Sequence, residues 1–243
     1  MLSKKETENA AKNGFSLLLN VDIEAMIAEE LDGLDAGFER IKIPSADSTV
    51  FEVPSGYDEP ETVTEFTAVI LYHHPLFAYY KTKYAGGNSP PDCGSFDGVT
   101  GVGTSEGEPG GLCKNCKYNQ FGSGKNGSKA CKNRRRIYVL REGDIFPLLL
   151  SLPTGSLREF TRYIKRLLSN GYKTNSVVTR FSLRSATNNA GLAYSQAQFN
   201  IVRELTDAEQ TLIEKVSEQV KNYSGRVGFD YDSPPMNGGG VDV

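Results

Sequence analysis

The chain has 243 residues, of which 38% are hydrophobic, and carries a formal net charge of −3 with a pI of about 5.6. A chain of this length and apolar content can bury one large core or two small ones. No apolar run approaches the roughly 20 residues that a membrane-spanning helix requires, so the sequence predicts no membrane partner.

The first third of the chain predicts a polar start, one helix and three strands. Residues 1–15 are expected to be flexible, and without a secretory apolar segment they favour the cytoplasm. Residues 22–31 place apolar side chains on one helical face, with Asp22 as the N-terminal cap. Strands are expected at 38–43, 49–53 and 64–72.

The second half predicts strands and helices in alternation. Strands are expected at 136–141, 145–152, 177–183 and 197–202. A helix should begin after Thr154 and end at Asn170-Gly171, and a second should begin at Thr206, where Thr206 and Glu209 match a capping box. Residues 224–243 are rich in Gly, Pro and acidic side chains, which predicts a disordered acidic tail.

These elements predict a mainly β, α+β protein. The favoured architecture is an OB-like antiparallel barrel with flanking helices, formed by a single domain at 16–223 that a cysteine-containing loop at 86–133 interrupts. Two alternatives stay open: a zinc ribbon fused to a separate α+β domain, and an antiparallel sheet with helices on one face.

Four cysteines lie in this glycine-rich loop, at Cys93, Cys113, Cys116 and Cys131. A C-x-x-C turn with two further cysteines at loop distance is typical of a closed, structural Zn²⁺ site, in which four thiolates leave no position for a catalytic water. The alternatives are two disulfides, a C-x-x-C redox pair, or thiols without a ligand. A reducing compartment weighs against the disulfides, and the absence of a strand-to-helix setting weighs against the redox pair.

The charge is distributed unevenly along the chain. Residues 111–203 hold 17 Lys and Arg against 3 acids, whereas residues 1–110 have a net charge of −12 and residues 204–243 a net charge of −5. A cationic middle between anionic ends is typical of a polyanion-binding groove. The alternative is a set of ordinary solvated faces, but these usually mix both signs, and residues 160–203 contain no acid.

Single-stranded nucleic acids bind through cations that follow the phosphates and aromatic rings that stack on bases. Because the loop has little core to fill, its rings are better candidates for stacking than rings in strands, for which core packing is the alternative. The predicted nucleic-acid contacts are Lys114, Lys117, Tyr118, Phe121, Lys125, Lys129, Lys132, Arg134, Arg136, Tyr138, Arg180 and Arg184.

Enzymatic chemistry is not indicated by the sequence. The two histidines, His73 and His74, are adjacent and should face opposite sides of any strand, at a strand end beside Pro75. The acids near the cysteines match no metal-binding pattern, and Gly122-Ser-Gly-Lys125 lacks the spacing of a phosphate-binding loop. The alternative functions are a zinc-stabilised adaptor that recruits replication proteins through its acidic tail and, less favoured, a metal-dependent nuclease.

The cysteine spacing, the run Arg134-Arg-Arg136 and the segment Leu152-Pro-Thr-Gly-Ser156 resemble proteins from phage and mobile-element replication regions. More broadly, the four-cysteine loop is similar to that of zinc-containing single-stranded DNA-binding proteins with an OB-fold, and the resemblance covers residues 90–185. It implies an accessory protein of replication or recombination that binds single-stranded DNA. The chain departs from the bacterial single-stranded DNA-binding family, since it lacks that family's signature strands and ends in Val241-Asp-Val243 rather than Pro-Phe.

Overall fold

The computed structural model describes residues 14–34, 37–44, 48–56, 59–82, 90–103, 110–188 and 191–228. Its α-helices are α2 (Ile23–Glu30), α3 (Leu157–Ser169) and α4 (Asp207–Ser224), and its short 3-10 turns are η1 (Ser16–Asn20), η2 (Lys117–Asn119), η3 (Lys125–Gly127), η4 (Thr154–Ser156) and η5 (Thr174–Ser176). Its strands are β1 (Arg40–Ile41), β2 (Phe51–Val53), β3 (Glu61–Val63), β4 (Glu65–Tyr79), β5 (Cys93–Ser95), β6 (Thr100–Gly103), β7 (Gly111–Leu112), β8 (Lys132–Leu140), β9 (Leu148–Leu152), β10 (Val177–Thr187) and β11 (Ala193–Glu204). The predicted mixed α+β class, dominated by strands, is confirmed.

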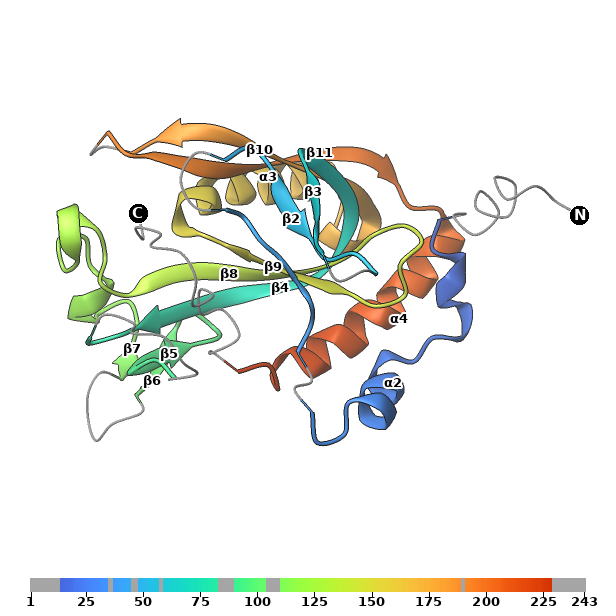
Figure 1. Cartoon of the computed structure of the whole chain (residues 1–243), viewed down its shortest axis with the longest axis horizontal. Helices are drawn as coiled ribbons and strands as arrows, with labels where there is room; N and C mark the ends of the chain where they lie inside the picture. Colours follow the sequence, from blue (N-terminus) through green and yellow to red (C-terminus); the bar gives the residue numbers. More distant parts are fainter. Residues whose placement is uncertain are drawn as a thin grey trace, which may run out of the picture.

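The long strand β4 organises the main sheet (Figure 1). Along one edge it pairs with β8, which pairs in turn with β9. Along the other edge it pairs first with β10, up to Val69, and then with β5, from Phe77 onward. Between these two points that edge of β4 has no partner strand in the described part of the chain, and Pro75, which lacks a backbone N–H, lies within this stretch. The sheet is therefore forked: β10 and β11 extend one half, and β5, β6 and β7 extend the other.

Five strands run across the main sheet in the order β9, β8, β4, β10, β11, and α3 connects β9 to β10. Among the described residues, β11 pairs only with β10, while the outer edge of β9 is taken by the parallel strand β1. The described strands therefore form an open sheet and do not close into a barrel.

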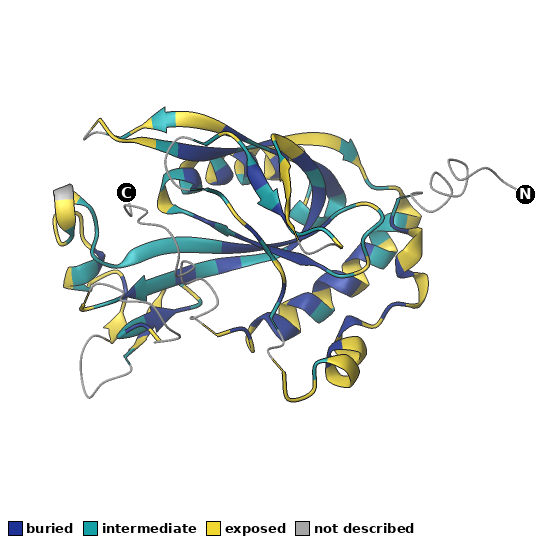
Figure 2. Cartoon of the chain, viewed as in Figure 1, coloured by how far each residue is buried: buried dark blue, intermediate teal, exposed yellow. Residues whose placement is uncertain are grey.

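Each face of the sheet is covered by its own apolar core. On one face, Ile137 and Val139 of β8 pack with α3 through Phe160 and Tyr163. On the other face, Tyr138 and Leu140 of β8 and Val69 of β4 pack against α4 and the N-terminal elements. Figure 2 shows β4 and β8 buried where the two cores meet and half-buried where the strands continue beyond them. Alternate residues of β8 thus enter different cores because strand side chains alternate between faces.

Local signals in the sequence set the helix ends as expected. The Asp22 side chain accepts a hydrogen bond from the Ala25 N–H at 3.1 Å, and Thr206 and Glu209 form the predicted capping box at the start of α4. Gly171 follows α3 with a φ of +79°, a conformation that glycine adopts without strain.

The folded region extends beyond the predicted boundaries of 16–223. Phe15, expected in a flexible start, is 1% exposed in the core under α4. Val227, expected in a disordered tail, is 4% exposed in the same core. The rest of both predicted termini, 1–13 and 229–243, lies outside the described residues. Within the described chain, no helix combines the length and the apolar character needed to span a membrane.

The ion pairs of Arg203 predict acid-sensitive stability. Arg203 donates to both carboxylate oxygens of Glu209 at 2.8 Å and also to Glu142. The bonds from Arg203 to Glu209, followed by those from Thr206, lower the pKa of Glu209 to about 2. The ionised carboxylate therefore stabilises the fold above about pH 4.5, and this contribution is lost as the pH falls toward about 2. We expect Glu209→Ala to cost about 1–2 kcal/mol at pH 7 in urea unfolding, because it removes both the cap and the ion pair. Glu218→Ala, at an exposed position of the same helix, should cost much less, and equal costs would contradict this account.

Candidate functional site

The four cysteines lie in a small substructure, here called the cysteine module, that comprises residues 90–103 and 110–131. It is attached to the far end of β4, where Tyr79 pairs with Cys93 and β5, β6 and β7 continue the sheet. Figure 1 shows the module projecting from the rest of the molecule, toward the same end as the tip of the β10–β11 hairpin. The predicted insertion therefore ends at Cys131, because β8 already begins at Lys132.

All four cysteines of the module line one small cavity of about 20 Å³. Burial first, and the other three thiols second, raise the pKa of Cys131 to about 12. The cavity wall leaves no room for a side chain at Gly101, where a Cβ atom would lie 2.7 Å from the Cys93 Sγ. All four thiols are free, so the structure contains no disulfide among them.

Metal binding is not demonstrated by this arrangement. Within the described part of the chain, no three His, Cys, Asp or Glu side chains form a group that could hold a metal ion. The cavity nevertheless brings together cysteines that are up to 38 positions apart in the sequence, from Cys93 to Cys131. The predicted ligand set is thus gathered at one place, and the zinc ion stays a prediction.

Hydrogen bonds hold the backbone of the module in place. The buried Asn119 amide donates to the Cys113 carbonyl at 2.9 Å and accepts from Lys129 at 3.2 Å. The Cys131 N–H donates to the Tyr118 carbonyl at 2.9 Å, and the Ser123 hydroxyl accepts from the Ala130 N–H at 3.0 Å. The loop that carries the predicted stacking rings is therefore well defined although it contains little regular structure.

The module presents one aromatic ring almost entirely to solvent. Phe121 is 80% exposed, the largest exposed fraction among the exposed large hydrophobic residues of the described chain. The Lys129 ammonium lies 5.2 Å from the centre of its ring. Tyr118 behaves differently, since it stacks on Tyr79 with ring centres 4.1 Å apart and has Lys117 above it at 5.0 Å. Phe121 has the accessibility that stacking on a base requires, whereas Tyr118 already has a stacking partner on one face.

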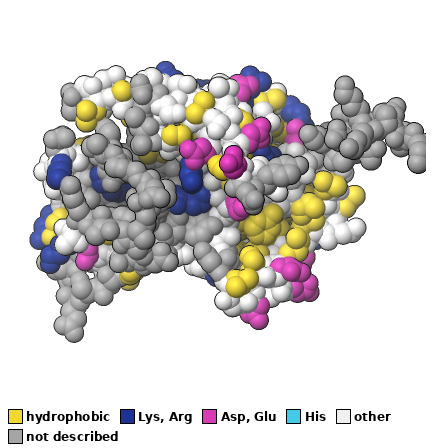
Figure 3. Space-filling model, viewed as in Figure 1, with side chains coloured by type: hydrophobic (Ala, Val, Ile, Leu, Met, Phe, Trp, Pro, Cys, Tyr) yellow, Lys and Arg dark blue, Asp and Glu magenta, His cyan; other side chains and the backbone are white. Residues whose placement is uncertain are grey.

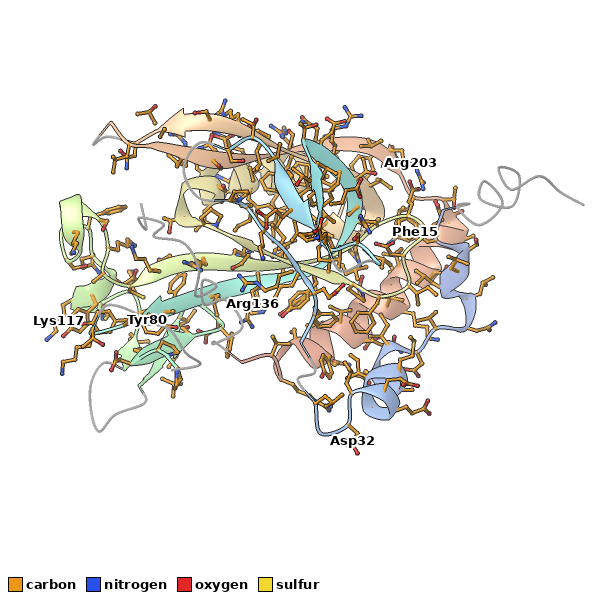
Figure 4. All side chains as sticks on the ribbon, viewed as in Figure 1. Phe15, Asp32, Tyr80, Lys117, Arg136 and Arg203 are labelled. Atoms are coloured by element: carbon orange, nitrogen blue, oxygen red, sulfur yellow. The ribbon has the colours of Figure 1, made fainter. Side chains whose placement is uncertain are left out.

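The predicted cations of the module lie at its surface. Lys114, Lys117 and Lys125 are exposed, Lys129 is half-buried, and Lys132 and Arg134 follow at the start of β8. Figure 3 shows Lys and Arg side chains gathered at this end of the molecule, and Figure 4 shows Lys117 at its outer edge. The sequence contains no acid between residues 109 and 141, and the acids of the module, Asp92 and Asp97, lie in its first segment.

Two predicted contacts are corrected by their burial. Arg136 is fully buried, with its guanidinium 2.9 Å from the Val227 carbonyl and also bonded to the Gly228 carbonyl; Figure 4 places it in the middle of the molecule. Tyr138 is also fully buried and packs edge-on against Phe38 with ring centres 5.2 Å apart. Neither side chain is accessible to a nucleic acid, because both face the core beneath α4.

The two predicted arginines of β10 are exposed but paired. Arg180 lies 3.6 Å from the Glu65 carboxylate. Arg184 donates to the Gln196 side chain at 2.6 Å and lies 3.7 Å from Glu159. Arg184 is nearer the hairpin tip and hence nearer the end of the molecule that carries the module (Figure 1). Arg180 lies opposite Thr67, in the part of β4 farthest from the module.

No family model, curated protein or solved structure matches this chain. The resemblance to zinc-containing single-stranded DNA-binding proteins therefore rests on the residues of the sequence alone. The function must be inferred from the site itself.

One cationic site, formed by Arg135 and His73, was not predicted from the sequence. Arg135 lies on the face of β8 opposite to Arg136 and donates to the Nδ1 of His73 from Nε at 3.0 Å and from Nη2 at 2.7 Å. His73 is not at a strand end as expected, since β4 continues past it to Tyr79. Strand alternation predicts that Arg135 lies on the opposite face of β8 from Arg134 and Arg136. Only the position of α4 in the fold determines which of these two faces is covered.

Burial, followed by the charge of Arg135, lowers the pKa of His73 to about 4. The fold therefore favours the neutral imidazole, so this group stabilises the protein above about pH 6.5 and its contribution is lost as the pH falls toward about 4. We expect a loss of about 2 kcal/mol in unfolding free energy between pH 7 and pH 5 from this residue. His73→Gln should reduce that pH dependence, and NMR titration of the imidazole should show the low pKa directly. A His73 pKa near 6.5 would contradict the assignment.

Proposed function

We propose that this protein binds single-stranded nucleic acid, with DNA as the ligand, in phage-type DNA replication or recombination in the cytoplasm of a bacterial host. The observation that carries the proposal is Phe121, an aromatic ring held 80% exposed on a hydrogen-bonded loop, with a lysine at its face and no acid in the surrounding sequence. Single-strand-binding proteins use such rings to stack on unpaired bases and use nearby cations to follow the phosphates.

The strand order offers a second line of support. An OB-fold is a five-stranded, partly open Greek-key barrel that binds oligonucleotides with the loops between strands 1 and 2 and between strands 4 and 5. If β4, β8, β9, β10 and β11 are counted as these five strands, the cysteine module is the first loop and the β10–β11 turn is the second. Both lie at the same end of the molecule (Figure 1). We therefore propose an OB-like framework in which pairing with β1 replaces the closing contact of β9.

We propose a structural zinc ion for the cysteine module, although the four side chains as placed do not form a metal-binding group. Cys93, Cys113, Cys116 and Cys131 supply four thiols around one cavity that is large enough for a single small ion. Four thiolates are the donor set that structural Zn²⁺ prefers. The ion would hold together the loop that carries Phe121 and the lysines, and it would have no catalytic role.

Binding is tested by fluorescence anisotropy with oligo-dT, a single-stranded RNA and a duplex of equal length, each at two salt concentrations. We expect preference for the single strands and an affinity that falls with salt. Phe121→Ala should weaken oligo-dT binding by about 5- to 100-fold, since one base stack contributes about 1–3 kcal/mol. The matched control is Leu168→Ala, which removes an exposed apolar side chain of α3 and should change nothing. Absence of binding by the wild-type protein would reject the proposal.

A protein-interaction adaptor is the second candidate, and a surface patch favours it. Leu17, Leu19, Met26 and Leu34 are exposed on and beside η1 and α2, and Figure 3 shows this apolar area bordered by acids. Apolar patches with a polar rim often mark protein-binding surfaces. An adaptor without nucleic-acid affinity would show no salt-dependent binding in the same titration, and a nuclease would degrade the oligonucleotide when a divalent ion is added.

A further inference from the structure

Arg135 is a half-buried cation without a counter-charge. Within the described part of the chain no carboxylate pairs with its guanidinium, and its only hydrogen-bond acceptor there is the His73 ring. Because the fold favours the neutral imidazole, His73 orients Arg135 without cancelling its charge. Glu159, the acidic residue of α3, already pairs with Arg162 at 2.8 Å and with Arg184 at 3.7 Å.

The guanidinium is held in a fixed position by its neighbours. It lies 5.9 Å from the centre of the Phe160 ring, and His73 contacts the same ring edge-on with ring centres 5.1 Å apart. Two guanidinium nitrogens face His73, whereas Nη1 has no acceptor among the described residues. A pre-oriented guanidinium with an open edge is suited to a phosphate or another oxyanion.

A second polar group that lacks a binding partner lies on the same face of β8. Asn133 is two residues from Arg135, so the two side chains project to the same side of the strand. Its side-chain oxygen is buried and has no hydrogen-bond partner in the described structure. An acceptor left without a donor is costly. Arg135 thus lacks an anion, and Asn133 lacks a hydrogen-bond donor. A nucleotide supplies the anion through its phosphate and the donor through its base.

We propose that Arg135 and Asn133 bind one nucleotide on the face of β8 that is directed toward α3, with Arg135 on the phosphate and the Asn133 side chain turning outward to accept a hydrogen bond from the base. This inference rests on the proposed function and names residues that extend the surface of the cysteine module toward α3. Within the arginine run it adds Arg135 to the predicted contact Arg134, in place of the buried Arg136.

The test combines oligo-dT titrations with NMR of the side chains. Arg135→Gln should weaken oligo-dT binding by about tenfold and reduce the salt slope by about 0.7, the value for one phosphate contact on a single strand. Arg135→Lys should recover the slope but only part of the affinity. Lys221→Gln, which removes one charge from α4, should stay within about twofold of the wild type. Circular dichroism and thermal unfolding confirm that each variant is folded.

The NMR arm uses dTMP as the probe and follows the Arg135 Nε–H and the Asn133 side-chain amide. Shifts of both signals in the wild type support the nucleotide site. If the wild type binds oligo-dT but Arg135→Gln binds it equally, with an unchanged salt slope, the site is overturned and the proposed function stands. If oligo-dT binding is absent while dTMP still shifts both signals, the proposed function fails and the site stands. If oligo-dT does not bind and dTMP shifts neither signal, both the nucleotide site and the proposed function are overturned.

Discussion

Arg136→Ala is expected to lower the free energy of unfolding by about 2–4 kcal/mol, because it leaves the buried Val227 carbonyl and the more exposed Gly228 carbonyl without their donor and opens a void in the core. The side chain is fully buried and bonds to the carbonyls of Val227 and Gly228. It also lies 5.6 Å from the Phe96 ring of the cysteine module. Urea unfolding measures the loss, and limited proteolysis should show earlier cleavage after α4.

The control for Arg136 is Arg162→Ala. Arg162 is an arginine whose side chain is 50% exposed and pairs with Glu159, so its removal should cost at most about 1 kcal/mol. The two accounts of Arg136 make opposite predictions. If Arg136 were a surface residue that contacts DNA, its variant would lose affinity without losing stability. Because Arg136 is buried, we expect its variant to lose stability and to retain affinity under conditions in which it is folded. A variant as stable as the wild type would contradict the structure at this position.

The second large effect is expected from the cysteines. Elemental analysis of the purified protein should find one zinc ion per chain. Cys116→Ser should release zinc, make the module sensitive to trypsin at its many lysines and weaken oligo-dT binding by about tenfold or more, because Phe121 is no longer held in place. The rest of the domain should persist, since neither of the two apolar cores contains a residue of the module.

Asn115→Ser is the matched control for Cys116→Ser, because Asn115 is an exposed neighbour in the same turn. It should retain zinc, trypsin resistance and affinity. The zinc proposal fails if the wild-type protein contains no metal and Cys116→Ser resists trypsin as well as the wild type does. In that case the four cysteines would pack together as small apolar side chains without a metal ion.

Helix ends were predictable from the sequence because their signals are local. Asp22, Thr206 and Gly171 act within a few residues of their own positions, and the structure contains each of these caps. The length of β4 was not predictable in this way. Pro75 and the two histidines signal a strand end, yet the strand continues because β8 pairs with it from Val69 to Ala78 and the other edge has no partner strand at Pro75 among the described residues.

The contact residues were predicted unevenly for a similar reason. Spacing identified the four cysteines, and the structure gathers them around one cavity. The arginine run was harder to interpret, since both faces of the sheet at β8 are covered, one by α3 and the other by α4. Alternation tells that Arg135 and Arg136 point in opposite directions. Only the tertiary structure shows that Arg136 is buried and that Arg135 is half-buried.

The reach of β4 past the cores has a consequence for engineering. Both β4 and β8 leave the packed region as a paired ribbon, and the strands of the module pair with β4 at the outer end of that ribbon, while Phe96 of the module packs against His74 and Arg136. Residues 81–131 could therefore be excised and the ribbon closed with a tight hairpin turn, which would yield a minimal scaffold onto which other recognition loops could be transplanted.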